Sequence, residues 1–138
     1  MKLRPKKVKF EKSHKGRAVN RICSNNVYNK LSRGTIILKT LMSCRLSAKQ
    51  IETIYITINK FLKRSGKIYI PIFPNTPISK KPNEIRMGKG KGAVSYWACK
   101  VLAGTVICEI ETNNRAKALK AIAYAKFRCP VKLRTIIL

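Results

Sequence analysis

Apolar residues recur at intervals of three and four along residues 48–65, which is the period of one face of an α-helix. Ser47 and Gln50 have the spacing of a capping box, in which each side chain satisfies a backbone amide at the start of a helix. The pattern predicts a helix that begins after Ser47 and stops at Gly66. Ile56 lies off the apolar face, so it is a candidate contact with a partner. The predicted buried face consists of Ile51, Ile54, Tyr55, Ile58, Phe61 and Leu62.

Shorter runs rich in β-branched residues predict strands. The segment Leu102-Ala103-Gly104 favours a tight turn, so the strands on either side of it are expected to form a hairpin. In that hairpin Cys99 and Cys108 would approach each other. Three prolines at positions 74, 77 and 82 are expected to keep the chain extended without ladder hydrogen bonds. The predicted strands are residues 35–42, 67–73, 96–101, 105–111 and 131–138.

A second helix is predicted to start at Thr112 or Asn113 and to end near Phe127, with Pro130 after it. The mixture of strands and helices indicates an α+β protein, a single-domain α/β sandwich in which two helices cover a mixed or antiparallel sheet. We expect residues 1–34 to form a basic N-terminal arm of this domain, and residues 35–138 to form its α/β part, the candidate for binding a partner, with an extended loop at 74–95. The predicted buried face of the second helix consists of Ala116, Leu119, Ile122, Ala123 and Phe127.

The net charge of the chain restricts the possible binding partners more than the predicted fold does. The 138 residues include 31 Lys and Arg but only 5 acidic residues, a formal charge of +26. A dense polyanion such as RNA neutralises this charge and releases counterions, so a nucleic-acid partner is expected. A membrane surface is the alternative, but we find no strongly amphipathic basic helix and no apolar run long enough to cross a bilayer. We expect neither membrane insertion nor a homo-oligomer.

The sequence contains little that indicates a catalytic site or a metal site. The five cysteines include no C-x-x-C pair and His14 is the only histidine, so we expect no metal and reduced, mostly buried thiols. Gly88 and Gly90, followed by Ala93, formally match a relaxed dinucleotide fingerprint, with Glu109 at a suitable distance. That motif needs a strand before it and a helix after it, and the sequence predicts neither. We therefore expect no cofactor and no enzyme activity.

The sequence contains clearer candidates for RNA-binding residues than for catalytic ones. Glycines alternate with lysines after Arg86, so this segment can follow a phosphate backbone closely and has almost nothing apolar to bury. Tyr96 and Trp97 could stack on a base, although for Trp97 core packing is the expected role. The candidate RNA-binding residues of the arm and the loop are Lys6, Lys7, Lys9, Lys12, His14, Lys15, Arg17, Arg86, Met87, Gly88, Lys89, Gly90, Lys91 and Gly92.

Four motifs, in order along nearly the whole chain, resemble the bacterial-type family of large-subunit ribosomal protein L-sixteen. They are a basic opening stretch, a helix start, a strand and a glycine-lysine loop followed by Tyr-Trp. The chain departs from the family where members carry arginines and it has Tyr55, Ile56 and Pro71, so we assign no phosphate contacts there. The matching residues are Pro5-Lys6, Lys9-Phe10, Lys12, His14-Lys15-Gly16-Arg17, Arg45-Leu46-Ser47, Gln50-Ile51-Glu52, Gly66-Lys67-Ile68-Tyr69, Phe73-Pro74, Lys81-Pro82, the run from Arg86 to Gly92, and Tyr96-Trp97.

The resemblance implies a structural constituent of the large ribosomal subunit. It implies contacts with large-subunit rRNA near the aminoacyl-tRNA site and the peptidyl-transferase region, with tRNA, and with neighbouring ribosomal proteins, and it adds Arg45 to the binding residues. A transient RNA chaperone or assembly factor is the alternative function. The departures from the family pattern, together with a composition heavy in Ile, Lys and Asn and without Asp, fit an organelle-encoded member and favour a mitochondrial ribosome over a plastid ribosome or a bacterial cytoplasm.

Overall fold

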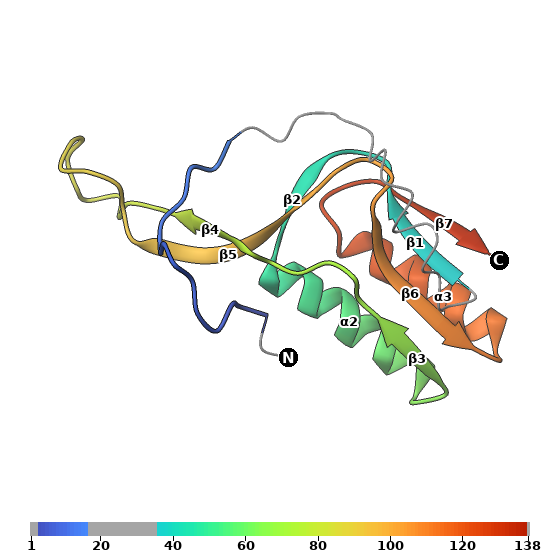
Figure 1. Cartoon of the computed structure of the whole chain (residues 1–138). Coiled ribbons are helices and arrows are strands. Elements are labelled where there is room, and N and C mark those ends of the chain that lie inside the picture. Colours follow the sequence, from blue (N-terminus) through green and yellow to red (C-terminus); the bar gives the residue numbers. More distant parts are fainter. Residues whose placement is uncertain (1–2, 17–35, 138) are drawn as a thin grey trace.

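The computed structural model describes residues 3–16 and 36–137 (Figure 1). Two helices and seven strands lie in this part of the chain. Arg17 and the first strand's predicted start at Thr35 lie outside the described residues. In chain order the elements are β1 (Ile36–Thr40), β2 (Cys44–Ser47), α2 (Ala48–Leu62), β3 (Gly66–Tyr69), β4 (Thr76–Ser79), β5 (Val94–Val101), β6 (Val106–Thr112), α3 (Arg115–Phe127) and β7 (Leu133–Ile137).

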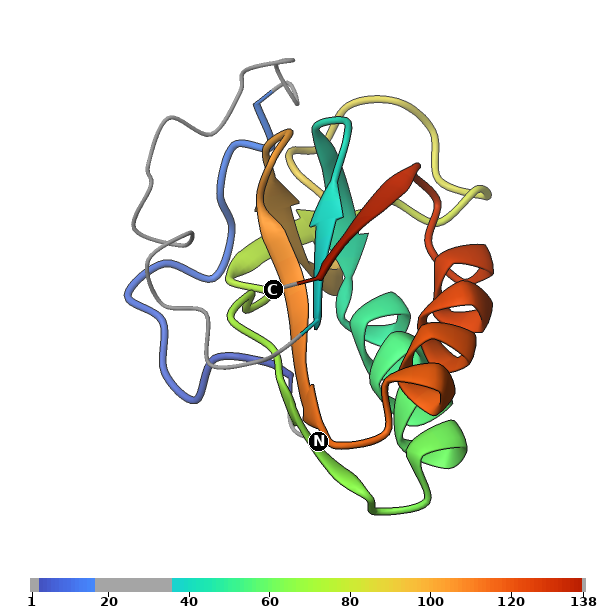
Figure 2. The same ribbon diagram turned by 90° about the vertical axis from the view of Figure 1, so that its right-hand side faces the viewer.

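The strands form two sheets. One has the order β3-β6-β1-β7 and the other has the order β2-β5-β4, and every strand pair in both is antiparallel. Helices α2 and α3 lie side by side on one face of the four-stranded sheet (Figure 2). This arrangement confirms the predicted α+β class with two helices and antiparallel sheets.

Helix α2 starts as its sequence predicts. The Ser47 hydroxyl accepts a hydrogen bond from the Gln50 amide at 3.3 Å, and the Gln50 side chain accepts one from the Ser47 amide at 2.8 Å. The predicted stop at Gly66 is wrong, because the helix ends at Leu62 and Gly66 already begins β3. Lys63 and Arg64 adopt left-handed backbone angles, with φ of 46° and 66°, and turn the chain there without a glycine.

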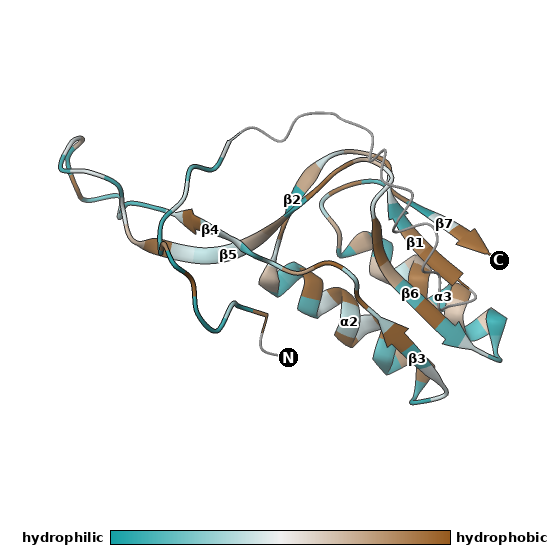
Figure 3. Ribbon diagram, viewed as in Figure 1, coloured by the Kyte–Doolittle hydropathy of each residue, from teal (hydrophilic) through white to brown (hydrophobic). Residues whose placement is uncertain are grey.

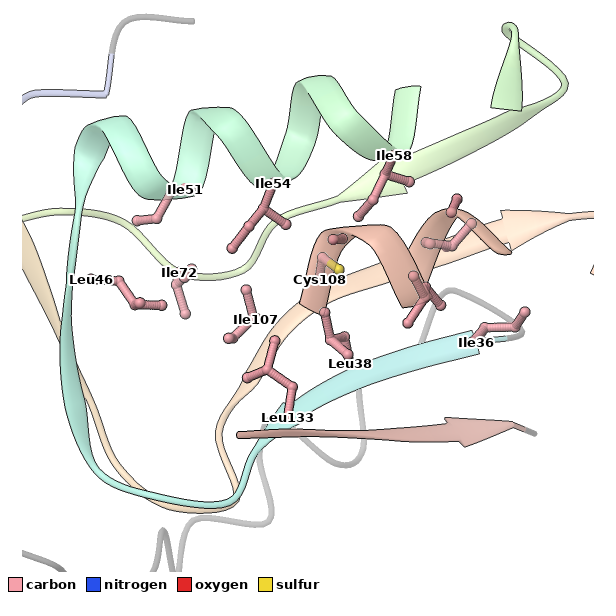
Figure 4. Close-up of a cluster of buried hydrophobic side chains, with 14 of the residues drawn as sticks. Ile36, Leu38, Leu46, Ile51, Ile54, Ile58, Ile72, Ile107, Cys108 and Leu133 are labelled. Carbon is pink, nitrogen blue, oxygen red and sulfur yellow. The ribbon is translucent and has the colours of Figure 1, made fainter. Parts of the chain in front are cut away.

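The core lies between the helices and the four-stranded sheet. Ile51, Ile54, Ile58 and Leu62 of α2 are buried, and Figure 4 shows Ile51, Ile54 and Ile58 pointing toward sheet residues such as Leu38. Tyr55 and Phe61, predicted on the same face, are only half-buried.

The outer surface of the helices is apolar in places. Phe61 stacks on Tyr124 of α3 with ring centroids 4.6 Å apart. Ile56 is 57% exposed, in agreement with its predicted position off the buried face.

The predicted hairpin around residues 102–104 is wrong. Strand β5 belongs to the three-stranded sheet and β6 to the four-stranded sheet, so Cys99 and Cys108 lie in different sheets. The segment that connects β5 to β6 instead forms hydrogen bonds with Thr40 at the end of β1. Thr40 accepts a hydrogen bond at its carbonyl from the Gly104 amide at 2.7 Å, and its amide donates to the Thr105 carbonyl at 3.0 Å. These bonds redirect the chain from one sheet into the other.

The proline-rich segment also differs from its prediction. The strand expected over residues 67–73 ends at Tyr69, and residues 76–79 form β4 although they include Pro77. In the register Pro77 lies opposite Trp97 of β5. Proline is tolerated here because β4 is an edge strand of its sheet, so the lost N–H costs no bond to a further strand.

Helix α3 buries a different face from the predicted one. Asn114 caps it, accepting a hydrogen bond from the Lys117 amide at 3.1 Å. Its buried residues are three alanines and Ile122, whereas Phe127 is 87% exposed. Small side chains let α3 approach α2 closely, so packing against α2 determines which face of α3 is buried. The hydropathy pattern of the sequence contains no information on this packing and therefore predicted the wrong face. The buried residues are Ala118, Ala121, Ile122 and Ala125.

Gly66 allows β3 to approach β6, so replacing it with Ala should destabilise the fold. A Cβ at this position would lie 2.6 Å from the Glu111 carbonyl oxygen and 2.9 Å from the Thr112 Cβ. We expect the free energy of unfolding to fall by about 1–3 kcal/mol, the usual cost of overpacking, as measured by urea unfolding. The control is Lys67→Ala on the same strand, which removes an exposed side chain and should have an effect within about 0.5 kcal/mol. Equal stability of Gly66→Ala and the wild type would contradict this role.

Candidate nucleic-acid interface

The Gly-Lys loop, residues 86–92, lies at the end of the molecule farthest from the helices (Figure 1). It joins β4 to β5, and a hydrogen bond from the Lys80 amide to the Ala93 carbonyl, at 3.1 Å, closes its base. All of its residues are exposed except Gly92, which is half-buried. The two strands therefore hold both ends of a cationic loop that is open to a partner.

The glycines of this loop have two different roles. Gly88 and Gly90 have φ of 99° and 78°, and Lys89 between them has φ of 54°. Since a Cβ at Gly88 or Gly90 would meet nothing within 4 Å, these two glycines serve the backbone turn. Gly92 instead lets the chain pass close to the backbone of Lys80, because a Cβ there would lie 2.7 Å from the Lys80 carbonyl oxygen.

The N-terminal arm docks onto this loop through reciprocal hydrogen bonds. The Lys12 ammonium donates to the Lys91 carbonyl at 2.9 Å, and the Lys91 ammonium donates to the Ser13 carbonyl at 2.5 Å. At its other end Leu3 is only 7% exposed and belongs to the hydrophobic core. The sequence placed the arm and the loop in separate segments, and the structure brings them together.

Arg45 of β2 positions the arm. Its Nη2 donates to the Lys15 carbonyl at 3.3 Å and also to the Gly16 carbonyl. Its Nε is buried without a hydrogen-bond partner among the described residues. In the free protein, Arg45 thus holds the arm against the three-stranded sheet.

Most of the candidate residues in the loop and the arm are exposed. Arg86, Met87, Lys89 and Lys91 of the loop are exposed. Figure 3 shows the arm and the loop region as mostly hydrophilic, in contrast to the core strands β1 and β6. The hydrogen bonds between Lys12, Ser13 and Lys91 therefore bring exposed cations of two chain segments side by side. The exposed arm candidates are Lys6, Lys7, Lys9, Lys12, His14 and Lys15.

The sequence analysis missed a cleft beside this surface. Its volume is about 1200 Å³, and it lies between the start of the arm, the start of α2 and the first residues of β5. Tyr96 and Trp97 line it together with Arg4 and Lys49, which sequence reasoning had not selected. Trp97 is half-buried and lies outside the core cluster, so its expected core packing is not observed. Only the fold brings these segments together, and no spacing in the sequence indicates the cleft.

The four cysteines in the described part of the chain have no features of a reactive or metal site. Burial raises the pKa of Cys44 to about 11, with Cys129 and Cys99 adding to the shift, and burial raises the pKa of Cys108 to about 12, with Glu109 and Cys129 adding to it. The thiolate is therefore scarce at neutral pH. Cys44, Cys99, Cys108 and Cys129 are free thiols, and no cluster of metal-ligating side chains occurs in residues 3–16 and 36–137.

Neither of the two helices in the described chain is long and apolar enough to cross a membrane.

Comparison with known proteins decides the family. The family model described as ribosomal protein L16p/L10e matches residues 5–136, which is nearly the whole chain. The chain belongs to this family. The resemblance read from the four motifs is thereby confirmed, and the matched span includes the arm from Pro5 onward and the whole Gly-Lys loop.

Curated members of the L16p/L10e family from bacteria are similar over almost their full lengths. The large ribosomal subunit protein uL16 of Acinetobacter baumannii (strain ATCC 17978) is 42% identical over 130 residues, which are 94% of this chain and 93% of that protein. The uL16 proteins of Maricaulis maris and Pelagibacter ubique are 41% and 39% identical over 134 residues, 97% of this chain and 96% of each of theirs. The family is one of structural ribosomal proteins, so this chain is not an enzyme.

Proposed function

We propose that this chain is a structural constituent of the large ribosomal subunit that binds rRNA with its arm and reaches tRNA with its Gly-Lys loop. The binding surface would lie near the aminoacyl-tRNA site and the peptidyl-transferase region. Membership of the L16p/L10e family supports the ribosomal role. The observation that carries the binding proposal is the mutual docking of Lys12, Ser13 and Lys91, which joins arm and loop into one cationic surface.

The way in which the two segments are anchored supports these separate roles, rRNA binding by the arm and tRNA contact by the loop. The arm is anchored at Leu3 and at residues 15–16, so its exposed cations are held in fixed positions along the sheet. The loop is held at its base by the bond between Lys80 and Ala93, at Gly88 by the Lys81 ammonium, which donates to the Gly88 carbonyl, and by the arm. A fixed cationic track suits the rRNA of a stable particle, and a projecting loop suits a ligand that arrives and leaves.

Salt dependence tests the RNA contacts. RNA affinity should fall steeply with salt, with a log–log slope that grows by about 0.7–0.9 for each phosphate that the protein neutralises. Replacing Lys9 with Gln should weaken binding and reduce the magnitude of that slope by about one. Filter binding to large-subunit rRNA fragments at several salt concentrations measures both values. Lys120→Gln is the matched control, since Lys120 is an exposed lysine of α3 on the helical side; an equal change of slope in both variants would contradict the assignment.

A transient RNA chaperone or assembly factor would use the same cationic surface. Quantitative mass spectrometry of translating ribosomes separates the two functions. A structural constituent is present at one copy per mature large subunit, whereas an assembly factor is found on precursor particles and is depleted from translating ones.

We also propose a mitochondrial ribosome as the location. The support is compositional: the chain is heavy in Ile, Lys and Asn, and all five of its acidic residues are Glu. Detection of this chain in large subunits purified from mitochondria would support the proposal. Its detection only in plastid ribosomes or in a bacterial cytoplasm would overturn it.

A further inference from the structure

The cleft beside the arm is a second potential binding site, distinct from the Gly-Lys loop. It has a volume of about 1200 Å³, and no residue of 86–92 lines it. Its walls come from the arm, α2 and β5, which lie far apart in the sequence. A space of this size accommodates more than one nucleotide-sized group, since drug-sized ligands occupy about 300–1000 Å³.

The lining of the cleft is positively charged. Arg4 and Lys6 contribute from the arm, Lys49 from the first turn of α2 and Arg45 from β2. Glu52 is the one carboxylate among the lining residues. Four cations against one anion favour an anionic ligand, and their separation over three elements suits successive phosphates of one strand.

The cleft is also lined by two aromatic residues that the fold leaves partly exposed. Tyr96 is 47% exposed, and Trp97 beside it is half-buried. Strand β2 pairs with β5 only from Ala98 to Val101, because Ser47 ends β2 and begins the turn into α2. The β5 residues before Ala98 therefore have no β2 partner, and both aromatic residues lie at this open edge.

We propose that this cleft binds an unpaired stretch of RNA, with bases stacked on Tyr96 and Trp97 and phosphates held by Arg4, Lys6 and Lys49. The inference rests on the proposed rRNA-binding function. Stacking on protein rings needs bases that are free of duplex stacking, so a single strand fits and a helix does not. An acidic peptide would satisfy the cations but would leave the two rings without a matching partner.

Trp97 is the only tryptophan of the chain, so its fluorescence reports on the cleft directly. The test titrates the full-length protein with a single-stranded oligouridylate of about six nucleotides, within the usual site size of single-strand binders. A duplex RNA of equal length and an acidic peptide serve as competing ligands. We expect the single strand to quench Trp97 saturably, and the duplex and the peptide to leave it nearly unchanged.

Variants show whether stacking is responsible. Tyr96→Ala should weaken the affinity read from Trp97 about tenfold, the usual loss for one stacked base, and Tyr96→Phe should retain it. Tyr124→Ala is the matched control, since Tyr124 is 55% exposed but lies on α3 and does not line the cleft. Lys49→Gln should reduce the salt dependence, and this charge variant tests the site independently of the aromatic ones.

The outcomes separate this inference from the proposed function. If filter binding shows that the single strand binds while Trp97 fluorescence is unchanged, the cleft proposal is overturned and the cationic surface remains. Equal quenching by the duplex or the acidic peptide would also overturn it. If the protein binds no RNA at low salt, both proposals fail.

Discussion

Replacing Ile54 with Ala is expected to lower the free energy of unfolding by about 2–5 kcal/mol, the range for truncating a large aliphatic side chain in a core. Ile54 is 1% exposed and faces the four-stranded sheet from the middle of α2 (Figure 4). Its removal leaves a cavity between the helix and the sheet that neighbouring side chains fill only in part. Urea unfolding followed by circular dichroism measures the effect. Since small domains are stable by about 5–15 kcal/mol, this single change removes a large share of the total.

Ile56 is the matched control for this experiment. It is the same residue type on the same helix, two positions further along, but it is 57% exposed. Ile56→Ala should change the free energy of unfolding by no more than about 0.5 kcal/mol. Ala has a higher helix propensity than Ile, so a comparable loss at the exposed position could not come from the helix itself. Such a loss at both positions would show that burial does not govern the result and would contradict the described core.

Replacing Lys89 and Lys91 together with Ala should leave the fold intact and slow tRNA accommodation about tenfold, equivalent to losing one charge-assisted hydrogen bond. Both side chains are exposed in a loop that contributes nothing to the core. Large subunits carrying the variant protein, combined with small subunits in rapid kinetic assays of aminoacyl-tRNA entry, provide the measurement. Thermal unfolding of the free protein should be unchanged.

The two lysines are expected to differ when they are replaced singly. Lys91 donates a hydrogen bond to the arm at Ser13, so Lys91→Ala should also loosen the arm between its remaining anchors at Leu3 and Arg45 and increase tryptic cleavage after Lys12. Lys89 has no role in the arm contacts, so Lys89→Ala should slow accommodation without that change. A control at Lys117, an exposed lysine of α3, should affect neither. Loss of folding in the Lys89→Ala variant would contradict a purely external role of this side chain.

The sequence predicted local structure better than it predicted contacts between elements. The capping box at Ser47 and the apolar face of α2 were confirmed, because both depend on residues within one or two helical turns. The hairpin around Gly104 was wrong because the turn residues permit a reversal but do not select the pairing partner. Thr40, more than sixty residues earlier in the chain, binds this connection and directs β6 away from β5.

For the candidate site too, the sequence predicted local features better than contacts between distant segments. The charge pattern identified the cations of the arm and of the Gly-Lys loop, and most of those described are exposed. The docking of Lys12 onto Lys91 and the cleft at Tyr96 arise from the fold, since residues far apart in the sequence meet there. Arg45 was assigned to the partner because its motif is shared by the family, whereas in the free protein its guanidinium binds the arm backbone.

A density map of the assembled large subunit containing this chain, with tRNA in the aminoacyl site, tests the central claim most directly. The account predicts that residues 3–16 lie along rRNA and that Lys89 and the other exposed residues of the Gly-Lys loop approach the tRNA. It also predicts that the helical side, with Lys117 and Lys120, faces away from the tRNA. A map in which the chain is absent from mature subunits, or in which α3 faces the tRNA and the loop is remote from it, would contradict the account.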